Sequence, residues 1–293
     1  MKITFLGTSA GEEYPGIWCD CEYCSKARKW GGKNIRRNNS VILDSDVMID
    51  IGKSALVQAE RFGVDIFKIK TLLVTHSHRD HFNTHNLWSR QMAPGYDKLS
   101  FEEKQKVSAP RFSSIPPLNM FGSKRVSDAL LNDGIDHNNP WAQIRFNLIK
   151  PFNKYCDEDK DLEIHTLDGN HNDGKIHSIN YIITRKNRTF LYLSDTGYPF
   201  DKTLEAISSY KYDFIITEGT AGFGDDSGAH MGLRTNLRLL EFFNANKLWK
   251  DKPDYFVTHI SPHWCPPHDE YSPVLAEKGL ILAYDGLVLE YPY

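Results

Sequence analysis

The chain has 293 residues, of which 40% are hydrophobic, 12% aromatic and 25% charged, the composition of an ordinary globular protein. No apolar run of about 18 residues occurs, which excludes a membrane-spanning helix. The chain has 35 Lys and Arg residues and 38 Asp and Glu residues, which gives a net charge of -3. Proteins that bind long nucleic acids usually have an excess of basic residues, and this sequence has none. A small-molecule substrate is therefore expected, and a nucleic-acid partner is not.

The start of the sequence is typical of a strand that enters a glycine turn, and it lacks the long apolar region of a secretory signal peptide. The cysteine count is five, and an odd number argues against a disulfide framework. Both features favour a cytoplasmic protein.

Short runs of β-branched and aromatic residues alternate with helix-like segments along most of the chain. We expect helices over residues 54–62, 203–209, 232–243 and 269–278. We expect strands over residues 2–6, 41–44, 47–50, 71–75, 162–167, 179–184, 189–193, 214–217, 255–258, 281–283 and 287–290. The early strands follow one another as hairpins and the later ones alternate with helices, which predicts a mixed α/β sandwich with two sheets.

This pattern is lost between residues 82 and 155. The stretch is rich in aromatic residues, Met and Pro, namely Trp88, Met92, Pro94, Tyr96, Phe101, Pro110, Phe112, Pro116, Pro117, Met120, Phe121 and Trp141. Loose segments of this length usually have a function. We expect residues 1–293 to form one domain in which 82–155 is an insertion that makes a lid, a pocket wall or the contact of a homodimer.

Four potential metal ligands directly follow the apolar strand 71–75. They are His76, His78, Asp80 and His81. Alternation along an extended chain places His76 and His78 on one side, and a tight turn can direct the other two towards a second ion about 3.5–4 Å from the first. A solvated His-rich loop would have no reason to follow a core strand so closely.

The run His76-Ser77-His78-Arg79-Asp80-His81 resembles the HxHxDH signature of the metallo-β-lactamase superfamily. The resemblance implies a four-layer αββα sandwich with an insertion after the motif. It also implies ligands at the ends of later strands, for which the sequence offers His171, Asp195 and His259. His165 and His177 compete with His171, but His165 lies inside a strand and His177 is too close to the next one.

By this resemblance, two divalent ions, Zn²⁺ or Mn²⁺, would occupy the site. One would be held by His76, His78 and His171, and the other by Asp80, His81 and His259, with Asp195 between them. Asp50, which closes the strand 47–50 and precedes Gly52, is expected to orient one of the ligand histidines. Asn38, Asn39 and Ser40 are interpreted as turn residues only.

The cysteines Cys19, Cys21 and Cys24 have CxCxxC spacing, and three thiolates need a fourth ligand to close a tetrahedral structural zinc site. The motif resembles a subgroup of the superfamily that contains the phosphodiesterase of the carbon–phosphorus lyase pathway and the pyrroloquinoline quinone biosynthesis protein B. In that subgroup a His soon after the last active-site His completes the site. The usual spacing places this His three residues after the active-site His, but position 262 is Pro, which cannot bind a metal ion. His263, one residue later, is therefore expected to be that ligand, with Cys265 and His268 as alternatives. A set of buried reduced thiols is the competing interpretation.

The resemblance implies a hydrolase in which a water shared by the two ions attacks a small, in some cases cyclic, phosphodiester. His230 and Asp80 are the expected catalytic residues, and His230 precedes a helix whose free N–H groups favour an anion. A helix cap or surface position is the alternative for His230. The competing functions are an endonuclease like the tRNA 3′-processing enzyme, and a non-hydrolytic metal protein like the quinone biosynthesis protein.

Overall fold

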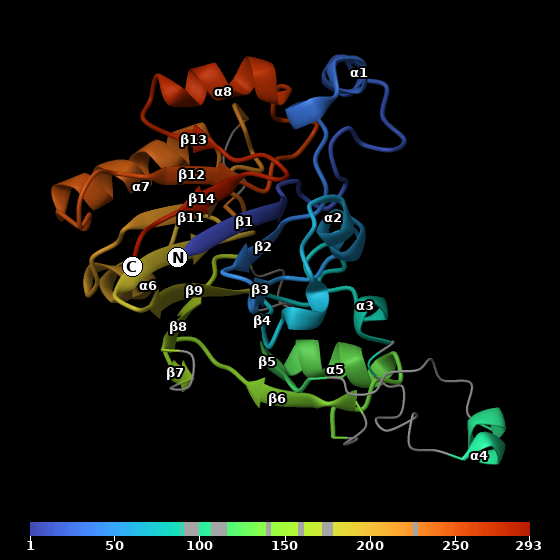
Figure 1. Cartoon of the computed structure of the whole chain (residues 1–293). Helices are drawn as coiled ribbons and strands as arrows, with labels where there is room; N and C mark the ends of the chain where they lie inside the picture. The colour runs from blue at the N-terminus through green and yellow to red at the C-terminus, as the bar shows by residue number, and fades with distance from the viewer. Residues whose placement is uncertain are drawn as a thin grey trace.

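The computed structural model describes residues 1–88, 90, 100–106, 116–138, 142–157, 161–171, 178–224 and 228–293 (Figure 1). Within these residues the strands form two seven-stranded sheets. The first sheet has the order β14-β1-β2-β3-β4-β5-β6, and its strands are β1 Lys2–Gly7, β2 Ser40–Leu43, β3 Val47–Ile49, β4 Thr71–Leu73, β5 Leu118–Gly122, β6 Ile144–Leu148 and β14 Val288–Glu290.

The second sheet has the order β13-β12-β11-β10-β9-β8-β7. Its strands are β7 Lys154–Asp157, β8 Leu162–Asp168, β9 Ile179–Arg185, β10 Arg188–Leu193, β11 Phe214–Glu218, β12 Tyr255–Thr258 and β13 Ile281–Leu282. The α-helices are α1 Glu22–Trp30, α2 Ala55–Arg61, α3 His85–Trp88, α4 Phe101–Lys106, α5 Lys124–Asn132, α6 Asp201–Ser208, α7 Leu233–Ala245 and α8 His268–Ala276, with 3₁₀ turns η1 Gly32–Asn34 and η2 Ile66–Lys68.

Separate apolar clusters hold the layers together. One cluster fills the space between the sheets and includes Ile3 and Val41 from the first sheet and Ile183 from the second. A second cluster joins the second sheet to its helices, and a third lies on the outer side of the first sheet. Figure 1 shows α7 and α8 on one side of the molecule and α2, α3 and α5 on the other. The αββα sandwich expected from the resemblance is confirmed.

All of the strands and helices expected from the sequence are present, with ends that differ by at most two residues. The expectation that the pattern is lost over 82–155 was wrong. β5 pairs in parallel with β4, β6 pairs in parallel with β5, and β7 begins the second sheet. The strand signal was hidden because β5 is short and directly follows Pro116 and Pro117 in a stretch dense with aromatic residues.

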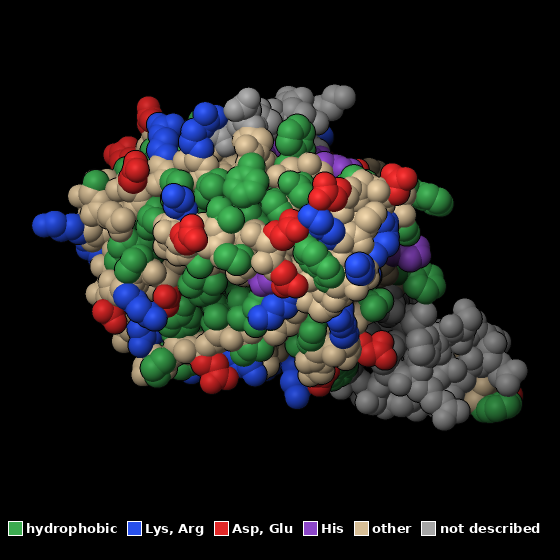
Figure 2. All heavy atoms as spheres, turned by 90° about the horizontal axis from the view of Figure 1, so that it is seen from above, with side chains coloured by type: hydrophobic (Ala, Val, Ile, Leu, Met, Phe, Trp, Pro, Cys, Tyr) green, Lys and Arg blue, Asp and Glu red, His purple; other side chains and the backbone are tan. Residues whose placement is uncertain are grey.

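Several of the residues that marked the 82–155 segment, namely Met92, Pro94, Tyr96, Pro110, Phe112 and Trp141, lie outside the described residues, as does His177. The roles of this segment as a lid or a dimer contact stay predictions. No helix among the described residues combines the length and apolar character needed to cross a membrane. On the face seen in Figure 2, basic and acidic side chains are interspersed among apolar ones.

Candidate metal centre

The strands that carry the ligand candidates end at one edge of the sandwich. β10, β11 and β12 are parallel to one another, and β8 runs in the same direction because two antiparallel pairings separate it from β10. The carboxyl ends of such strands meet at one edge, where a site can be assembled. His171, Asp195 and His259 follow β8, β10 and β12 there, facing the segment that follows β4.

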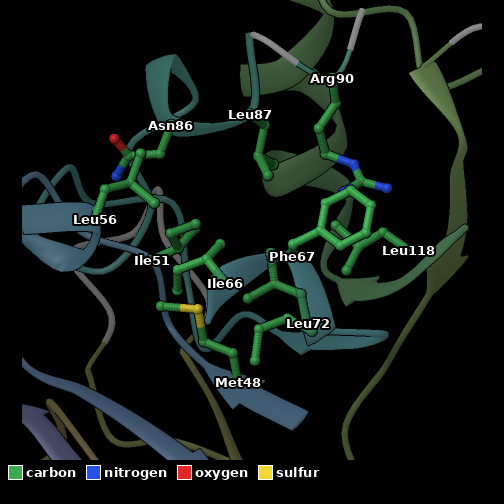
Figure 3. Close-up of a pocket in the computed structure, with 11 residues that line it drawn as sticks. Met48, Ile51, Leu56, Ile66, Phe67, Leu72, Asn86, Leu87, Arg90 and Leu118 are labelled. Carbon is green, nitrogen blue, oxygen red and sulfur yellow. The ribbon is translucent and has the colours of Figure 1, made fainter. Parts of the chain in front are cut away.

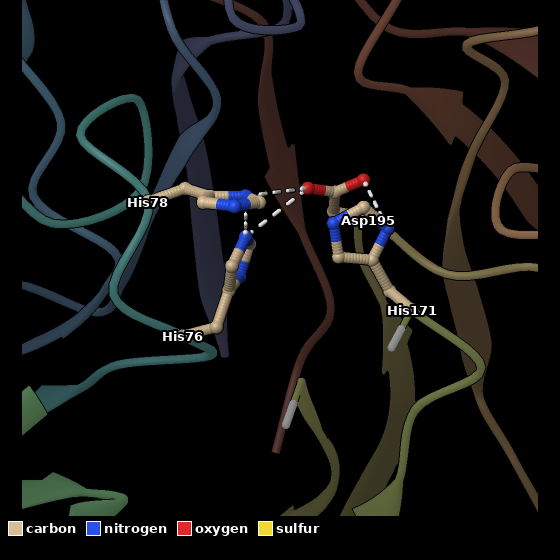
Figure 4. A group of neighbouring side chains, drawn as sticks. All are labelled: His76, His78, His171 and Asp195. Carbon is tan, nitrogen blue, oxygen red and sulfur yellow. Dashed lines mark hydrogen bonds and ion pairs between the residues drawn. The ribbon is translucent and has the colours of Figure 1, made fainter. Parts of the chain in front are cut away.

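The first group consists of His76, His78, His171 and Asp195, whose ligand atoms all lie within 4.8 Å of one another. His76 Nε2 is 2.9 Å from His78 Nδ1 and 3.1 Å from Asp195 Oδ2. His171 Nδ1 is 3.5 Å from the other carboxylate oxygen, Oδ1. Figure 4 shows the carboxylate of Asp195 between the His76–His78 pair and His171.

The second group consists of Asp80, His81, Asp195 and His259. His81 Nε2 lies 3.0 Å from His259 Nε2, 3.3 Å from Asp80 Oδ2 and 3.5 Å from Asp195 Oδ2. Asp195 therefore belongs to both groups, as the resemblance implied. The structure brings together all the expected active-site ligands, and that they bind metal stays a prediction.

Hydrogen bonds to the outer ring nitrogens fix the orientation of two ligand histidines. The Nδ1 atom of His81 contacts Asp50 Oδ2 at 2.7 Å, and because a carboxylate only accepts, this nitrogen carries the proton. The hydroxyl of Thr220 donates to the carbonyl oxygen of His259 at 2.9 Å, so at 2.8 Å it accepts from His259 Nδ1. In the neutral form of each ring, Nε2 is then the nitrogen with the free lone pair, and the two Nε2 atoms face each other.

Such an arrangement fits a cation. Two bare nitrogen lone pairs 3.0 Å apart repel each other, and carboxylate oxygens of Asp80 and Asp195 surround them. A divalent ion at the centre of each group would remove this repulsion, and imidazole with carboxylate is a ligand set that suits Zn²⁺ or Mn²⁺. The carboxylate atom Asp195 Oδ1 is buried and lacks a hydrogen bond of good geometry, as expected for an atom left to a metal ion.

Burial and neighbouring charges shift the ionisation of the group strongly. Burial, with a further contribution from His81, lowers the pKa of His76 to about 4, so this imidazole is neutral at pH 7. Burial alone would raise the pKa of Asp195, but the imidazoles of His259 and His230 hold it well below its usual range. Neutral imidazole and ionised carboxylate are the forms that bind metal ions.

Three residues of the site have left-handed backbone conformations. The φ angles are +61° at Asp50, +49° at Asp195 and +55° at His259. Residues other than Gly rarely adopt this region, and it costs about 1–3 kcal/mol where the surroundings enforce it. Each of these residues ends or follows a strand, so the strained turn directs its side chain towards the centre.

His230 is brought to the same centre from the loop before α7. Its Nδ1 atom is 3.0 Å from Asp195 Oδ1 and 3.5 Å from Glu218 Oε1, and its ring centroid is 5.1 Å from that of His171. Burial alone would lower the pKa of His230, but the neighbouring carboxylates of Asp195 and Glu218 raise it to about 10. His230 is therefore part of the site and not a surface residue.

Glu218 is a residue of this centre that the sequence analysis did not single out. It ends β11 and is fully buried. One of its oxygens accepts from the backbone N–H of Met231, and the other accepts from that of Thr220 at 2.8 Å and lies 3.8 Å from His259 Nδ1. An acidic residue at the end of an otherwise apolar strand was the signal that could have identified it.

The interpretation of Asn39 as a turn residue only is wrong. Its side chain is fully buried and donates to the hydroxyls of Tyr192 at 2.7 Å and Ser194 at 2.9 Å. It also accepts from the hydroxyl of Thr258 at 2.8 Å. Ser194 and Thr258 directly precede two of the ligand candidates, so Asn39 fixes the ends of β10 and β12 relative to each other.

Of the two competitors of His171, His165 does not enter the site, and His177 lies outside the described residues. His165 lies in β8 and its Nδ1 contacts the hydroxyl of Tyr210 at 3.1 Å. His171 instead has its Nδ1 atom 3.3 Å from the carbonyl oxygen of Ala229, on the loop that carries His230. The choice of His171 over His165 agrees with the structure.

The thiols of Cys19, Cys21 and Cys24 converge at the start of α1, with their sulfur atoms within 4.8 Å of one another. The structure does not bring His263, the expected fourth ligand, to this group, because its Nε2 pairs with the carboxylate of Glu12. Pro262, the residue before His263, does lie near the three thiols. A Cβ atom added to Gly16 would be 3.7 Å from Pro262 and 3.9 Å from Cys24 Sγ, so both residues border the same position.

The two alternatives are also engaged elsewhere. The buried thiol of Cys265 donates to the carbonyl oxygen of Gly219 at 3.3 Å. His268 Nδ1 accepts from Arg36 Nη2 at 2.9 Å. Among the described residues the group therefore holds the three thiols without a fourth His, Cys or acidic ligand.

No protein-family model and no curated protein matches the sequence. A diphosphatase from the PhnP family is 21% identical, covers 99% of this chain and 96% of its own, and gives a TM-score of 0.69. Zn²⁺-bound PqqB from Methylobacterium extorquens is 14% identical over 99% of this chain and 100% of its own, with a TM-score of 0.71. The metallo-β-lactamase fold protein YhfI from Bacillus subtilis is 16% identical over 99% of both chains, with a TM-score of 0.65.

These likenesses extend over nearly the full length of each protein, and at this level of identity they concern the fold. They agree with the two mixed sheets and the outer helices. The chain has the metallo-β-lactamase fold.

Proposed function

We propose that this protein is a metal-dependent phosphodiesterase that uses two divalent ions, Zn²⁺ or Mn²⁺, on a small linear or cyclic phosphodiester. The observation that carries the proposal is the sharing of Asp195 by two ligand groups. His76, His78 and His171 would hold one ion, and Asp80, His81 and His259 the other. When bound, such a pair of ions makes a water nucleophilic at neutral pH and neutralises the phosphoryl oxygens.

His230 would supply the proton for the leaving alcohol. Its Nδ1 atom is directed at Asp195 and Glu218, which leaves the opposite edge of the imidazole, with Nε2, to face a bound phosphodiester. General acid catalysis of this kind contributes about 10²–10⁴ to the rate. Glu218 would act as a positioning residue, because it holds both His230 and the loop at Thr220.

Basic side chains border the site and support an anionic substrate. A hollow of about 650 Å³ next to the HxHxDH motif is lined by Lys53 and Arg79, together with Trp88 from the 82–155 segment. An adjoining hollow of about 890 Å³ shares Ser77 with it and is lined by Lys124, Arg125 and Lys150. Lys124 is paired with Asp128, and Asp168 also lines this hollow, so Arg125 and Lys150 are the basic residues that support the argument. Lysine and arginine in a cleft raise the local concentration of an anion.

The proposal is tested with metal-loaded protein on bis(p-nitrophenyl) phosphate, p-nitrophenyl phosphate and a tRNA precursor. We expect turnover of the diester only, and its loss in His78→Ala. His165→Ala is the matched control, since that His contacts Tyr210 outside the ligand groups. Cleavage of the precursor with little diester turnover would favour the endonuclease. Two bound ions without hydrolysis of any of the three would favour the non-hydrolytic function.

The cysteine group is proposed to hold a third, structural Zn²⁺. Three clustered thiols in a tight turn are the ligand type of structural zinc sites, and the fourth position would be completed by a ligand other than His263. Metal analysis of the purified protein is expected to give about three ions per chain.

A further inference from the structure

An apolar cavity of about 180 Å³ opens on the outer side of the first sheet (Figure 3). Its floor is formed by Met48 of β3 and Leu72 of β4, and its walls come from α2, η2, α3 and β5. None of its described lining residues is a metal-ligand candidate. The cavity is therefore separate from the metal centre.

The cavity is open to solvent at an apolar rim. Leu56 is 37% exposed and Phe67 is 55% exposed, although both line the cavity. An apolar cavity of roughly 150 Å³ in another protein stays dry and takes up benzene. A cavity of 180 Å³ is therefore large enough for one aromatic ring with a short substituent.

A cation without an anionic partner among the described residues lies at the same cavity. Arg90 donates through Nη2 to the carbonyl oxygens of Pro116 and, at 3.5 Å, Gln143, but its Nε atom is buried and has no hydrogen-bond partner within the described part of the chain. Burial lowers the pKa of Arg90 to about 10, and no described carboxylate lies close enough to raise it. Figure 3 shows its guanidinium on the side of Phe67 and Leu118. A buried charge without a counter-ion is costly, and an anion in the cavity would remove that cost.

From the apolar lining and the unpaired guanidinium together, we propose that this cavity binds a small apolar monocarboxylate. The hydrocarbon part would fill the space above Met48 and Leu72, and the carboxylate would accept from Nε of Arg90. A charge-assisted bond in a partly buried site is stronger than a neutral one, so the carboxylate contributes specificity as well as affinity.

The wall of this cavity is continuous with the metal-binding segment. Ile51 lines the cavity, and its backbone N–H donates to the carbonyl oxygen of His81 at 2.7 Å. Its own carbonyl oxygen accepts from the N–H of Asn83 at 2.9 Å. A ligand that fills the cavity would thus contact Ile51, whose backbone is hydrogen-bonded to the HxHxDH segment.

The test compares phenylacetate with phenylacetamide, its neutral analogue of the same size, by isothermal titration calorimetry on metal-loaded full-length protein. We expect phenylacetate to bind at least about ten-fold more tightly, a difference of about 1.4 kcal/mol. Arg90→Gln should remove that preference while phenylacetamide still binds. Arg61→Gln, which removes a charge from α2 outside the cavity, should keep it.

Equal affinity of the wild-type protein for the two compounds would overturn the proposal, as would a lack of phenylacetate binding at about 10 mM. If Arg90→Gln still binds phenylacetate more tightly than phenylacetamide, the carboxylate binds elsewhere, for example to the metal ions. That result would also overturn the proposal. Arg90→Lys is the second variant in case Arg90→Gln does not fold. It keeps the charge but not the Nε–H group, so it should weaken phenylacetate binding and leave phenylacetamide binding unchanged.

Discussion

The Nδ1 atom of His81 lies 2.7 Å from Oδ2 of Asp50, and both side chains are fully buried. The same carboxylate accepts from the backbone N–H and the hydroxyl of Thr75, the last residue before the HxHxDH segment. Asp50 thus holds both the start of that segment and one of its ligands. Its role in orienting a ligand His, expected from the sequence, agrees with this geometry.

Replacing Asp50 by Asn is expected to weaken metal binding by about 10–100-fold, the usual effect of losing such a partner. The carboxylate of Asp50 accepts hydrogen bonds from both Thr75 and His81. The amide of Asn has only one acceptor oxygen, so it cannot replace all of these bonds. Competition with a chelator measures the affinity. Asp251→Asn, at an exposed position, is the control and should bind metal as the wild type does. Unchanged affinity in Asp50→Asn would exclude the orienting role.

His230→Gln is expected to reduce kcat for the diester by about 10²–10⁴ while the metal content stays the same. The variant removes the proposed proton donor but none of the ligands. Steady-state kinetics with metal analysis on the same samples separate the two effects. A loss of metal together with activity would identify His230 as a ligand, and full activity would exclude it as the acid.

Gly52→Ala is expected to disturb the second ligand group. A Cβ atom at this position would lie 1.9 Å from the carbonyl oxygen of Asp80, so the backbone that carries Asp80 and His81 must move. We expect the loss of about one ion per chain, measured by metal analysis. Gly134→Ala is the control, because it has positive φ but open space, and it should cost about 1 kcal/mol of stability without loss of metal. Full metal content in Gly52→Ala would contradict this placement of the second ion.

Cys24→Ser is expected to remove the structural zinc, so that the metal content falls from about three ions to two, and to lower the melting temperature, because zinc binding stabilises the fold. The buried Cys24 shares its group with Cys19 and Cys21, whereas Cys156 is exposed on β7 and serves as the control. Wild-type zinc content in Cys24→Ser would mean that these cysteines are only buried thiols.

Acid is expected to destabilise the protein through His268. Its Nδ1 accepts from Arg36, and burial together with the Arg36 charge lowers its pKa to about 3. The unfolded chain, in which a His has a pKa of about 6.5, takes up a proton first as the pH falls. The contribution of His268 is therefore present above pH 6.5 and is lost as the pH falls from there towards 3.

Urea unfolding at pH 7 and pH 5 measures this loss, which amounts to at most about 1.4 kcal/mol per pH unit from one group. His268→Gln should show a smaller difference between the two pH values than the wild type. His263→Gln, at the exposed His that pairs with Glu12, should keep the wild-type difference. Equal differences in all three proteins would mean that His268 does not carry the effect.

The ligand groups were predictable from the sequence because each ligand stands at a boundary that the sequence marks. His76, His78, Asp80 and His81 are contiguous, and Asp195 and His259 directly follow apolar strands whose pattern is plain. The fold followed from the same strands, since alternation and length identify them without knowledge of their partners.

The remaining parts depend on contacts that a linear pattern does not contain. Asn39 acts through two strands that lie far from it in sequence, β10 and β12. His263 was chosen from its distance in sequence to His259, but in the structure the side chain at this position pairs with Glu12. β5 is recognisable as a strand only through its pairing with β4, and β6 only through its pairing with β5.

The use of one carboxylate by both ligand groups has a thermodynamic consequence. Asp195 offers a single negative charge to two cations, so the first ion to bind screens the charge that would attract the second. The two affinities should then differ, with negative cooperativity between the positions. Under limiting metal supply, the protein would accumulate in a half-loaded form that is inactive but already partly stabilised.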